Sequence, residues 1–235
     1  MYDAMLVKFQ KRLSQRYQYI VSYALQKLLS ENASVNLNNY FAGYGPTLAR
    51  QNLNIEGTGN LWWGLTLSLN SSMISPTPVT PTISGIDLNG AGNTTFPLSE
   101  AVPGLSYHCF NAGCGKAQLA QAVASFNSTW AGKKAMNGVT VPTLILPSNY
   151  SLGAPIITQD VRLTKTIAYK ERYRLALYGE FFNLFNISNL SGYNFTLDTV
   201  KTPQTFAFGQ ATARINQVFG SGGPRAEQLG VRFSF

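Results

Sequence analysis

The chain ends in Glu227-Gln-Leu-Gly-Val-Arg-Phe-Ser-Phe235, and this stretch decides how the rest is interpreted. Polarity alternates strictly: one face of an extended strand carries Leu229, Val231, Phe233 and Phe235, and the other carries Gln228, Gly230, Arg232 and Ser234. Chain ends fray unless something holds them. A membrane β-barrel holds its last strand, because that strand closes the cylinder with its apolar face toward lipid. An edge strand of a soluble β-sandwich shows the same alternation, so both folds stay open at this point.

The composition indicates a β-protein with few charges. Only 12% of the 235 residues are charged, about half the usual share, while aromatic residues also reach 12%. These values argue against disorder and against a helical bundle. The 18 Lys+Arg and 10 Asp+Glu give a net charge of +8, but the cations form no stripe, so we expect no nucleic-acid partner. The chain contains no run of about 18 apolar residues, so the sequence predicts no transmembrane helix.

Period-two alternation recurs along the chain and predicts seven strands. They cover residues 2–12, 17–29, 48–57, 61–73, 156–168, 173–185 and 227–235. The connections alternate in length: the short ones are 13–16, 57–60 and 169–172, and the long ones are 31–46, 76–155 and 186–224. Within the long connections we expect a short helix at 116–126 and a local strand at 205–217.

The alternation of loop lengths favours a barrel over a sandwich. Outer-membrane barrels have short periplasmic turns at one rim and long extracellular loops at the other. The sequence therefore predicts an all-β fold, an antiparallel meander of about seven long strands that forms a partial transmembrane β-barrel with long extracellular loops at 76–155 and 186–224. Single-chain bacterial barrels have even strand numbers, and residues 1–12 lack the apolar core of a signal peptide. We therefore expect residues 1–235 to be the C-terminal segment of a longer barrel.

Four stretches resemble Oar-like TonB-dependent receptors. Residues 159–165 (QDVRLTK) resemble the start of a strand in that family, residues 180–186 (EFFNLFN) a strand end, and residues 224–235 the closing strand. Residues 124–133 resemble a loop segment found there. The resemblance covers most of the chain and is densest after Gln159.

The resemblance implies an outer-membrane barrel of 22 strands with an N-terminal plug, which takes up ligands with energy from the inner membrane. Compared with that family, the sequence lacks the plug domain and a signal peptide, so we expect a piece that is not transport-competent alone. The implied partners are outer-membrane lipid, the remaining strands and plug of the parent receptor, and TonB only through the missing N-terminal part. The barrel-assembly machinery reads the family's C-terminal aromatic residue, a position matched by Phe235, and the signal would comprise Leu229, Val231, Phe233 and Phe235.

Charged residues on the polar faces of the predicted strands are candidates for a lumen. These residues are Asp160, Arg162, Arg174, Glu180 and Arg232. They could contact a solute, but pairing of charges along the barrel wall is the simpler interpretation. Trp62, Trp63, Tyr17, Tyr19 and Tyr169 lie near strand ends on the short-turn side and suggest an interfacial aromatic girdle.

The chain offers little support for an enzyme. His108 is the only histidine and lies beside Cys109, with Cys114 close by, whereas a metal site needs three or four suitably spaced ligands. A disulfide between Cys109 and Cys114 suits an oxidising outer face better. No nucleophile elbow or phosphate-binding glycine loop is present, so we expect no catalysis and no cofactor.

The resulting hypothesis is a C-terminal portion of a TonB-dependent receptor in the bacterial outer membrane. Two alternatives remain: a structural or adhesive outer-membrane surface protein whose loops bind a partner, and a soluble secreted β-sandwich with carbohydrate-binding loops.

Overall fold

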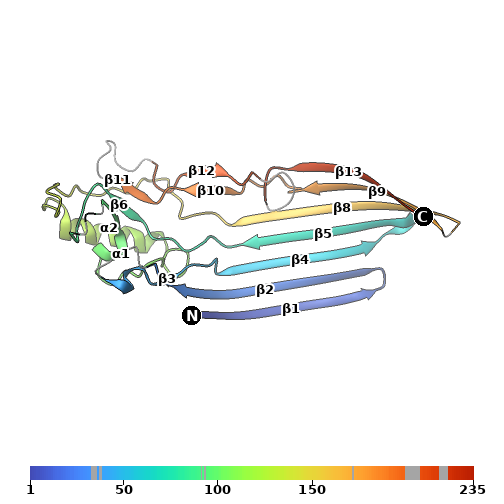
Figure 1. Ribbon diagram of the computed structural model, residues 1–235, viewed down its shortest axis with the longest axis horizontal. Helices are drawn as coiled ribbons and strands as arrows, with labels where there is room; N and C mark the ends of the chain where they lie inside the picture. The colour runs from blue at the N-terminus through green and yellow to red at the C-terminus, as the bar shows by residue number, and fades with distance from the viewer. Residues whose placement is uncertain are drawn as a thin grey trace.

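Seven long antiparallel strands lie side by side in one sheet in the computed structural model, which describes residues 1–32, 36, 39–90, 92, 94–170, 172–198, 207–216 and 222–235 (Figure 1). The strands pair in sequence order, β1-β2-β4-β5-β8-β9-β13. Their bounds are β1 Tyr2–Ser14, β2 Tyr17–Ser30, β4 Gln51–Asn60, β5 Leu65–Ile74, β8 Ile156–Tyr169, β9 Tyr173–Phe182 and β13 Ala226–Ser234. The predicted all-β antiparallel meander is confirmed. Strands of about ten residues have the length that a tilted membrane crossing requires.

The short connections gather at one end of the sheet, where the chain also ends (Figure 1). The turn between β1 and β2 consists of Gln15 and Arg16, whose φ angles are 51° and 77°. Two central residues with positive φ match the twist of a tight hairpin. The predicted turn at 169–172 lies between β8 and β9, although residue 171 is outside the described residues.

The turn between β4 and β5 corrects the sequence prediction of a reversal at 57–60. Gly57 and Gly59 instead lie inside β4, opposite Tyr19 and Tyr17 of β2. The reversal follows at the 3₁₀ turn η2, Trp62–Gly64, where Trp63 has a φ of 58°. Glycine also occurs within strands, where the lack of a side chain leaves space for a large side chain on the neighbouring strand. The Gly-Thr-Gly-Asn pattern alone therefore did not locate the turn.

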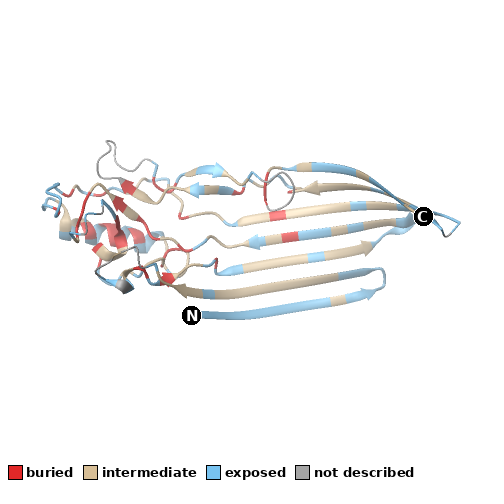
Figure 2. Cartoon of the chain, viewed as in Figure 1, coloured by how far each residue is buried: buried red, intermediate tan, exposed pale blue. Residues whose placement is uncertain are grey.

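The long connections fold into a compact unit beyond the other end of the sheet. The described residues of 76–155, together with β11 (Thr196–Asp198) and Phe208, form this unit, which we call the cap. It contains β6 Thr82–Ser84, β7 Thr95–Pro97, α1 Leu98–Ala101 and α2 Lys116–Trp130. Its core buries side chains such as Ile83, Leu98, Phe110, Phe126 and Leu144. Figure 2 shows the buried residues concentrated in this region, while the long strands are mostly intermediate or exposed.

The long connections 76–155 and 186–224 both contribute to the cap. β11 lies parallel to β6, which also pairs with β7, and the hydroxyl oxygens of Thr82 and Thr196 are 3.1 Å apart. Leu197 and Phe208 complete the hydrophobic core. Two segments that the sequence presents as separate loops are thus one folded unit.

The remaining elements connect the cap to the sheet. They are η1 Tyr40–Gly43, β3 Gly45–Pro46, which pairs with β2, and the β10 Leu190–Tyr193 and β12 Ala211–Arg214 pair. β12 lies within the predicted strand 205–217, of which residues 205, 206 and 217 are outside the described part. The predicted helix at 116–126 is α2, and it continues to Trp130. Leu119, Ala122 and Val123 are buried along one side of it, as their spacing predicts.

Candidate functional site

The cross-strand register places all five predicted lumen residues on one face of the sheet. Arg162 lies opposite Glu180, and Gln228 of β13 lies opposite Glu180 from the other side. Residues directly opposite each other in an antiparallel pair share a face. Counting by twos from these pairs puts Asp160, Arg174 and Arg232 on the same face. We call this face the polar wall; its orientation toward a lumen stays a prediction.

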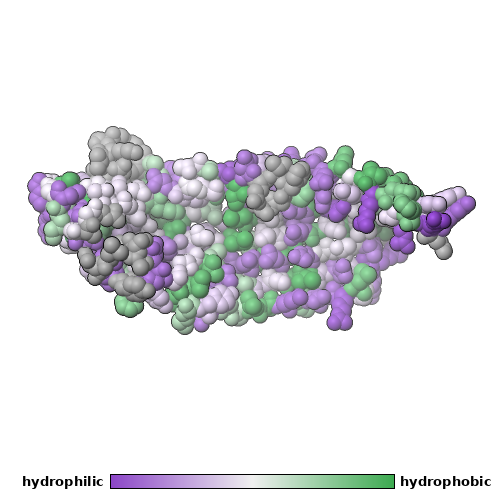
Figure 3. Space-filling model, viewed as in Figure 1, coloured by the Kyte–Doolittle hydropathy of each residue, from purple (hydrophilic) through white to green (hydrophobic). Residues whose placement is uncertain are grey.

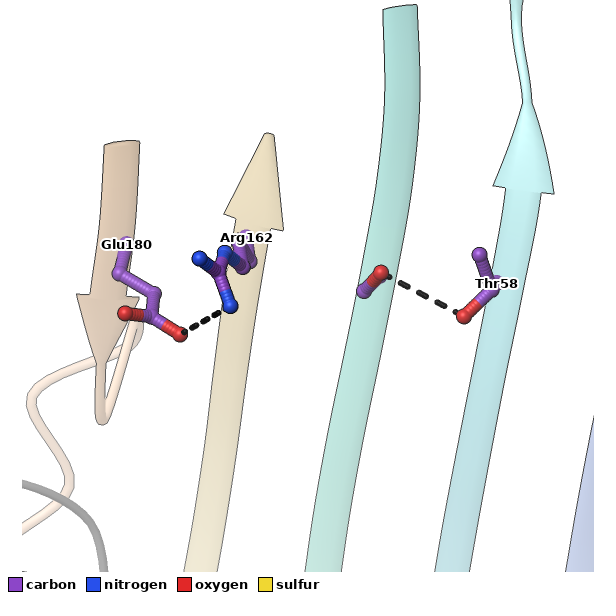
Figure 4. A network of polar contacts seen from close by, with 4 residues as sticks. Thr58, Arg162 and Glu180 are labelled. Atoms are coloured by element: carbon purple, nitrogen blue, oxygen red, sulfur yellow. Dashed lines mark hydrogen bonds and ion pairs between the residues drawn. The ribbon is translucent and has the colours of Figure 1, made fainter. Parts of the chain in front are cut away.

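Three side chains of the polar wall, from β8 and β9, lie in contact with one another and extend as a stack over a glycine of β13. The Arg162 guanidinium lies 4.0 Å from the ring centre of Tyr178, and its Nη1 atom is 3.8 Å from Glu180 Oε1 (Figure 4). The Tyr178 ring covers Gly230 so closely that a Cβ there would be 2.6 Å from Cε2 of the ring. Glycine at 230 therefore makes room for the ring, which in turn supports Arg162.

A hollow of about 500 Å³ lies beside this stack on the sheet. Its lining includes the carboxylates of Glu56, Asp160 and Glu180, and Arg162 is the only basic residue that lines it within the described part of the chain. On the neighbouring strands, the hydroxyl oxygens of Thr58 and Ser68 are 3.4 Å apart (Figure 4). The hollow thus presents an excess of negative groups, which would favour a cation or hydrogen-bond donors.

Charge pairing explains only part of the polar wall. Arg162 and Glu180 form an ion pair, and Asp160 accepts a hydrogen bond from the backbone N–H of Asn183 (2.8 Å). Within the described part of the chain, Arg174 and Arg232 form no ion pair. These two arginines are exposed near the short-turn end, so pairing along the wall is not their role there.

Three asparagines spaced by three residues join β8, β9 and the start of β13. Asn183 contacts backbone atoms of Ile187 and Gly223. Asn189 donates to the carbonyls of Ile157 and Gly222 and accepts from the Ile157 N–H, all within 2.9 Å. Both are buried. Asn186 accepts a hydrogen bond from the backbone N–H of Arg225 (3.4 Å).

The opposite face of the sheet is apolar and exposed. Besides the C-terminal residues it carries Met5, Val7, Phe9, Val21, Leu53, Ile55, Leu67, Leu69, Val161, Leu163, Leu175 and Leu177. No second sheet covers it among the described residues. An exposed apolar surface of this extent marks an interaction with lipid or protein, and the lack of a facing layer is incompatible with the β-sandwich alternative.

Two lysines on this apolar face reach the short-turn end. Lys11 Nζ donates to the carbonyls of Ser14 (2.8 Å) and Tyr17 (3.1 Å), and Lys165 Nζ donates to the carbonyl of Trp63. Long cationic side chains cover apolar surface with their methylene groups and place the charge at its edge. The positions of both lysines therefore agree with a membrane boundary at the short turns.

Aromatic side chains gather at the same end. Tyr17 stacks with Tyr19 and Tyr173 with Phe233, and both pairs lie on the apolar face. Trp62 and Trp63 are exposed in the turn itself. Figure 3 shows a hydrophobic patch over the C-terminal part of β13, where Leu229 is 87% and Phe235 84% exposed.

The cap contains the expected cysteine pair. Cys109 and Cys114 form a disulfide, so neither thiolate is available to a metal. His108 packs on Tyr107, and burial lowers the pKa of its imidazole, partly offset by a hydrogen bond to the Pro46 carbonyl. The described residues include no group of three or more His, Cys, Asp or Glu that could hold a metal ion.

A comparison with known protein families gives a match over most of the chain. A family described as outer membrane beta barrel domain matches residues 1–228. The chain belongs to this outer membrane beta barrel domain family. It is therefore located in the bacterial outer membrane. Barrels of this kind turn an apolar face to lipid, and that the exposed apolar face of this sheet does so stays a prediction.

Neither the functionally characterised proteins nor the solved structures include a significant match to this outer membrane beta barrel domain. No helix among the described residues has both the length and the apolar character needed to cross a membrane.

Sequence reasoning did not single out Tyr178, Gly230 or the buried asparagines. Tyr178 has the same parity as Glu180, and an isolated glycine within a strand is a known sign of close approach by another group. Those two signals together could have suggested the stack. The partners of Asn183 and Asn189 had no comparable signal, because they are backbone atoms of distant segments.

Proposed function

We propose that this outer membrane beta barrel domain is the C-terminal barrel portion of a TonB-dependent receptor. In this proposal, the strands supply part of the barrel wall, the polar wall lines the lumen beside a plug, and the cap faces the exterior. Energised uptake would require the plug and the contact with TonB, both outside residues 1–235. The assembly machinery would recognise Leu229, Val231, Phe233 and Phe235.

The observation that supports this proposal is that three of the four family-like stretches meet at one junction. Residues 159–165 contribute Asp160 and Arg162, which contact Asn183 and Glu180 of residues 180–186. Residues 180–186 also contribute Asn186, which contacts Arg225 of residues 224–235. The residues that carry the resemblance thus have a shared structural role where the wall meets the loops.

A second candidate is an adhesive surface protein. The cap exposes large apolar side chains, among them Met136 and Ile145, and exposed apolar residues can form a protein-binding surface. In this alternative the cap would hold a partner and no solute would cross.

Uptake measured in the source bacterium separates the two candidates. Cells with the intact gene, without the gene, and without TonB are incubated with spent growth medium, and periplasmic compounds are quantified by mass spectrometry. The receptor hypothesis predicts at least one compound whose accumulation is lost in both deletions. Surface attachment that depends on the gene, with accumulation unchanged in both deletions, would favour the adhesive candidate and contradict uptake.

A further inference from the structure

A pocket of about 560 Å³ opens between the segment around η1 and the cap. Ser99, Glu100 and Ala101 of α1 line it, and α1 lies beyond the end of the sheet opposite the short turns (Figure 1). Its aromatic lining comes from both sides and consists of Phe41, Tyr44, Phe96, Tyr107 and Trp130. The pocket thus depends on two connections that are far apart in the sequence.

Two of the aromatic side chains that line the pocket are exposed to solvent. Phe41 is 74% exposed and Tyr44 is exposed as well, although both line the pocket. Trp130 is held in place because its Nε1–H donates to the carbonyl of Ala101 (3.2 Å). Ring faces with fixed positions provide apolar contact area at low conformational cost.

Glu100 and Ser99 give the pocket polar groups without partners. Oε2 of Glu100 accepts hydrogen bonds from Asn36 (2.7 Å) and Asn89 (3.5 Å). Its Oε1 atom and the Ser99 hydroxyl are buried and have no hydrogen-bond partner within the described part of the chain. Buried polar atoms of this kind are unfavourable unless a donor or acceptor reaches them.

The charge of the lining limits what could bind. Among the residues that the structure describes, neither lysine nor arginine lines the pocket, despite the net charge of +8 on the chain. An anion would therefore face Glu100 without a compensating cation. Burial raises the pKa of Glu100, opposed by the hydrogen bonds from Asn36 and Asn89.

We propose that this pocket binds a neutral oligosaccharide. A sugar ring has an apolar face that stacks on Phe41 or Tyr44 and hydroxyl groups that can donate to Glu100 Oε1 and pair with the Ser99 hydroxyl. A quaternary ammonium ion has no hydrogen to donate to Oε1, and a simple hydrocarbon leaves both polar atoms unpaired. The pocket would hold the sugar on the outer side of the barrel.

The biological role of this site rests on the proposed uptake function. Binding of the sugar to the pocket does not depend on that function. Binding is measured on the purified full-length protein in detergent, without TonB or energy. If the purified protein binds no sugar, the proposed pocket is wrong and the uptake function is unaffected. If it binds sugar but the compound does not accumulate in a TonB-dependent way, the uptake function is wrong and the proposed pocket is unaffected.

The test uses a glycan array of neutral, anionic and cationic oligosaccharides, followed by fluorescence titration of the best neutral sugar. Phe41→Ala should weaken its binding roughly tenfold, the loss of one stacked ring. Glu100→Gln removes the carboxylate acceptor and should also weaken binding roughly tenfold. The matched control is Phe185→Ala, because Phe185 is 69% exposed and does not line the pocket; it should bind like the wild type.

Each variant is checked for its intact Cys109–Cys114 disulfide and for an unchanged thermal unfolding curve. Phe41 is exposed outside the cap core, so its truncation should leave the fold intact. Absence of binding to every neutral glycan, a preference for charged glycans, or equal affinities for wild type and Phe41→Ala would each overturn the proposal.

Discussion

The stack of Gly230, Tyr178 and Arg162 allows a sharp test of the polar wall. In Gly230→Ala, the new methyl group would overlap the Tyr178 ring, which must then move away from Arg162. Overpacking of this kind costs about 1–3 kcal/mol, and loss of the cation–π contact adds about 0.5–1 kcal/mol. Replacing a strand glycine returns about 0.5–1 kcal/mol. The free energy of unfolding should therefore fall by about 2 kcal/mol.

Gly179→Ala is the matched control, since Gly179 lies on the neighbouring strand but on the apolar face. A Cβ at Gly179 would be 3.4 Å from Leu229 Cδ2, which is ordinary contact. This variant should be neutral or slightly more stable, by up to about 1 kcal/mol. The assay is guanidinium unfolding of the full-length protein in lipid vesicles, followed by tryptophan fluorescence.

A double-mutant cycle separates the ring clash from other effects of alanine. In a Tyr178→Ala background, Gly230→Ala should no longer destabilise the protein, because the ring is gone. Equal destabilisation by Gly230→Ala with and without the Tyr178 ring would refute the proposed contact, and so would equal effects of Gly230→Ala and Gly179→Ala.

Three further predictions concern the wall junction, the cap and the chain end. Asn189→Ala removes three hydrogen bonds to backbone groups and should lower the free energy of unfolding by about 2–4 kcal/mol, whereas alanine at the exposed Asn149 should leave the unfolding midpoint nearly unchanged. The unreduced, denatured protein should contain no free thiol, and replacing both cysteines by serine should destabilise the cap by about 2 kcal/mol; two titratable thiols would contradict the disulfide. Phe235→Ala should reduce the heat-modifiable, folded fraction in outer-membrane preparations, while Phe185→Ala should not; equal folded fractions would show that Phe235 is not an assembly signal.

The strands and their faces could be predicted because their signal is local. Alternation within residues 156–168 and 173–185 places Asp160, Arg162 and Glu180 on one parity, and pairing across a short turn then brings them together. The same reasoning placed the C-terminal strand. The prediction of a turn at residues 57–60 was wrong, because the glycines there lie in a strand opposite Tyr17 and Tyr19.

The cap could not be predicted because its contacts are distant in sequence and follow no regular period. Phe110, Phe126 and Phe208 meet in one core although they come from a turn region, a helix and a different connection. Among these, only the face of α2 left a periodic pattern. The pocket beside Glu100 likewise depends on how residues around η1 approach α1, which no local pattern encodes.

Site-directed spin labelling tests the central claim, that the two faces of this sheet meet lipid and water. In a background with both native cysteines replaced by serine, a label is attached to cysteine at positions 229 to 234 of the full-length protein in membranes. Collision rates with oxygen, which partitions into lipid, and with a water-soluble nickel chelate are then measured. The account predicts high oxygen accessibility at positions 229, 231 and 233, and low values at positions 230, 232 and 234. Uniform accessibility along β13, or a higher nickel-chelate rate at position 231 than at position 232, would contradict it.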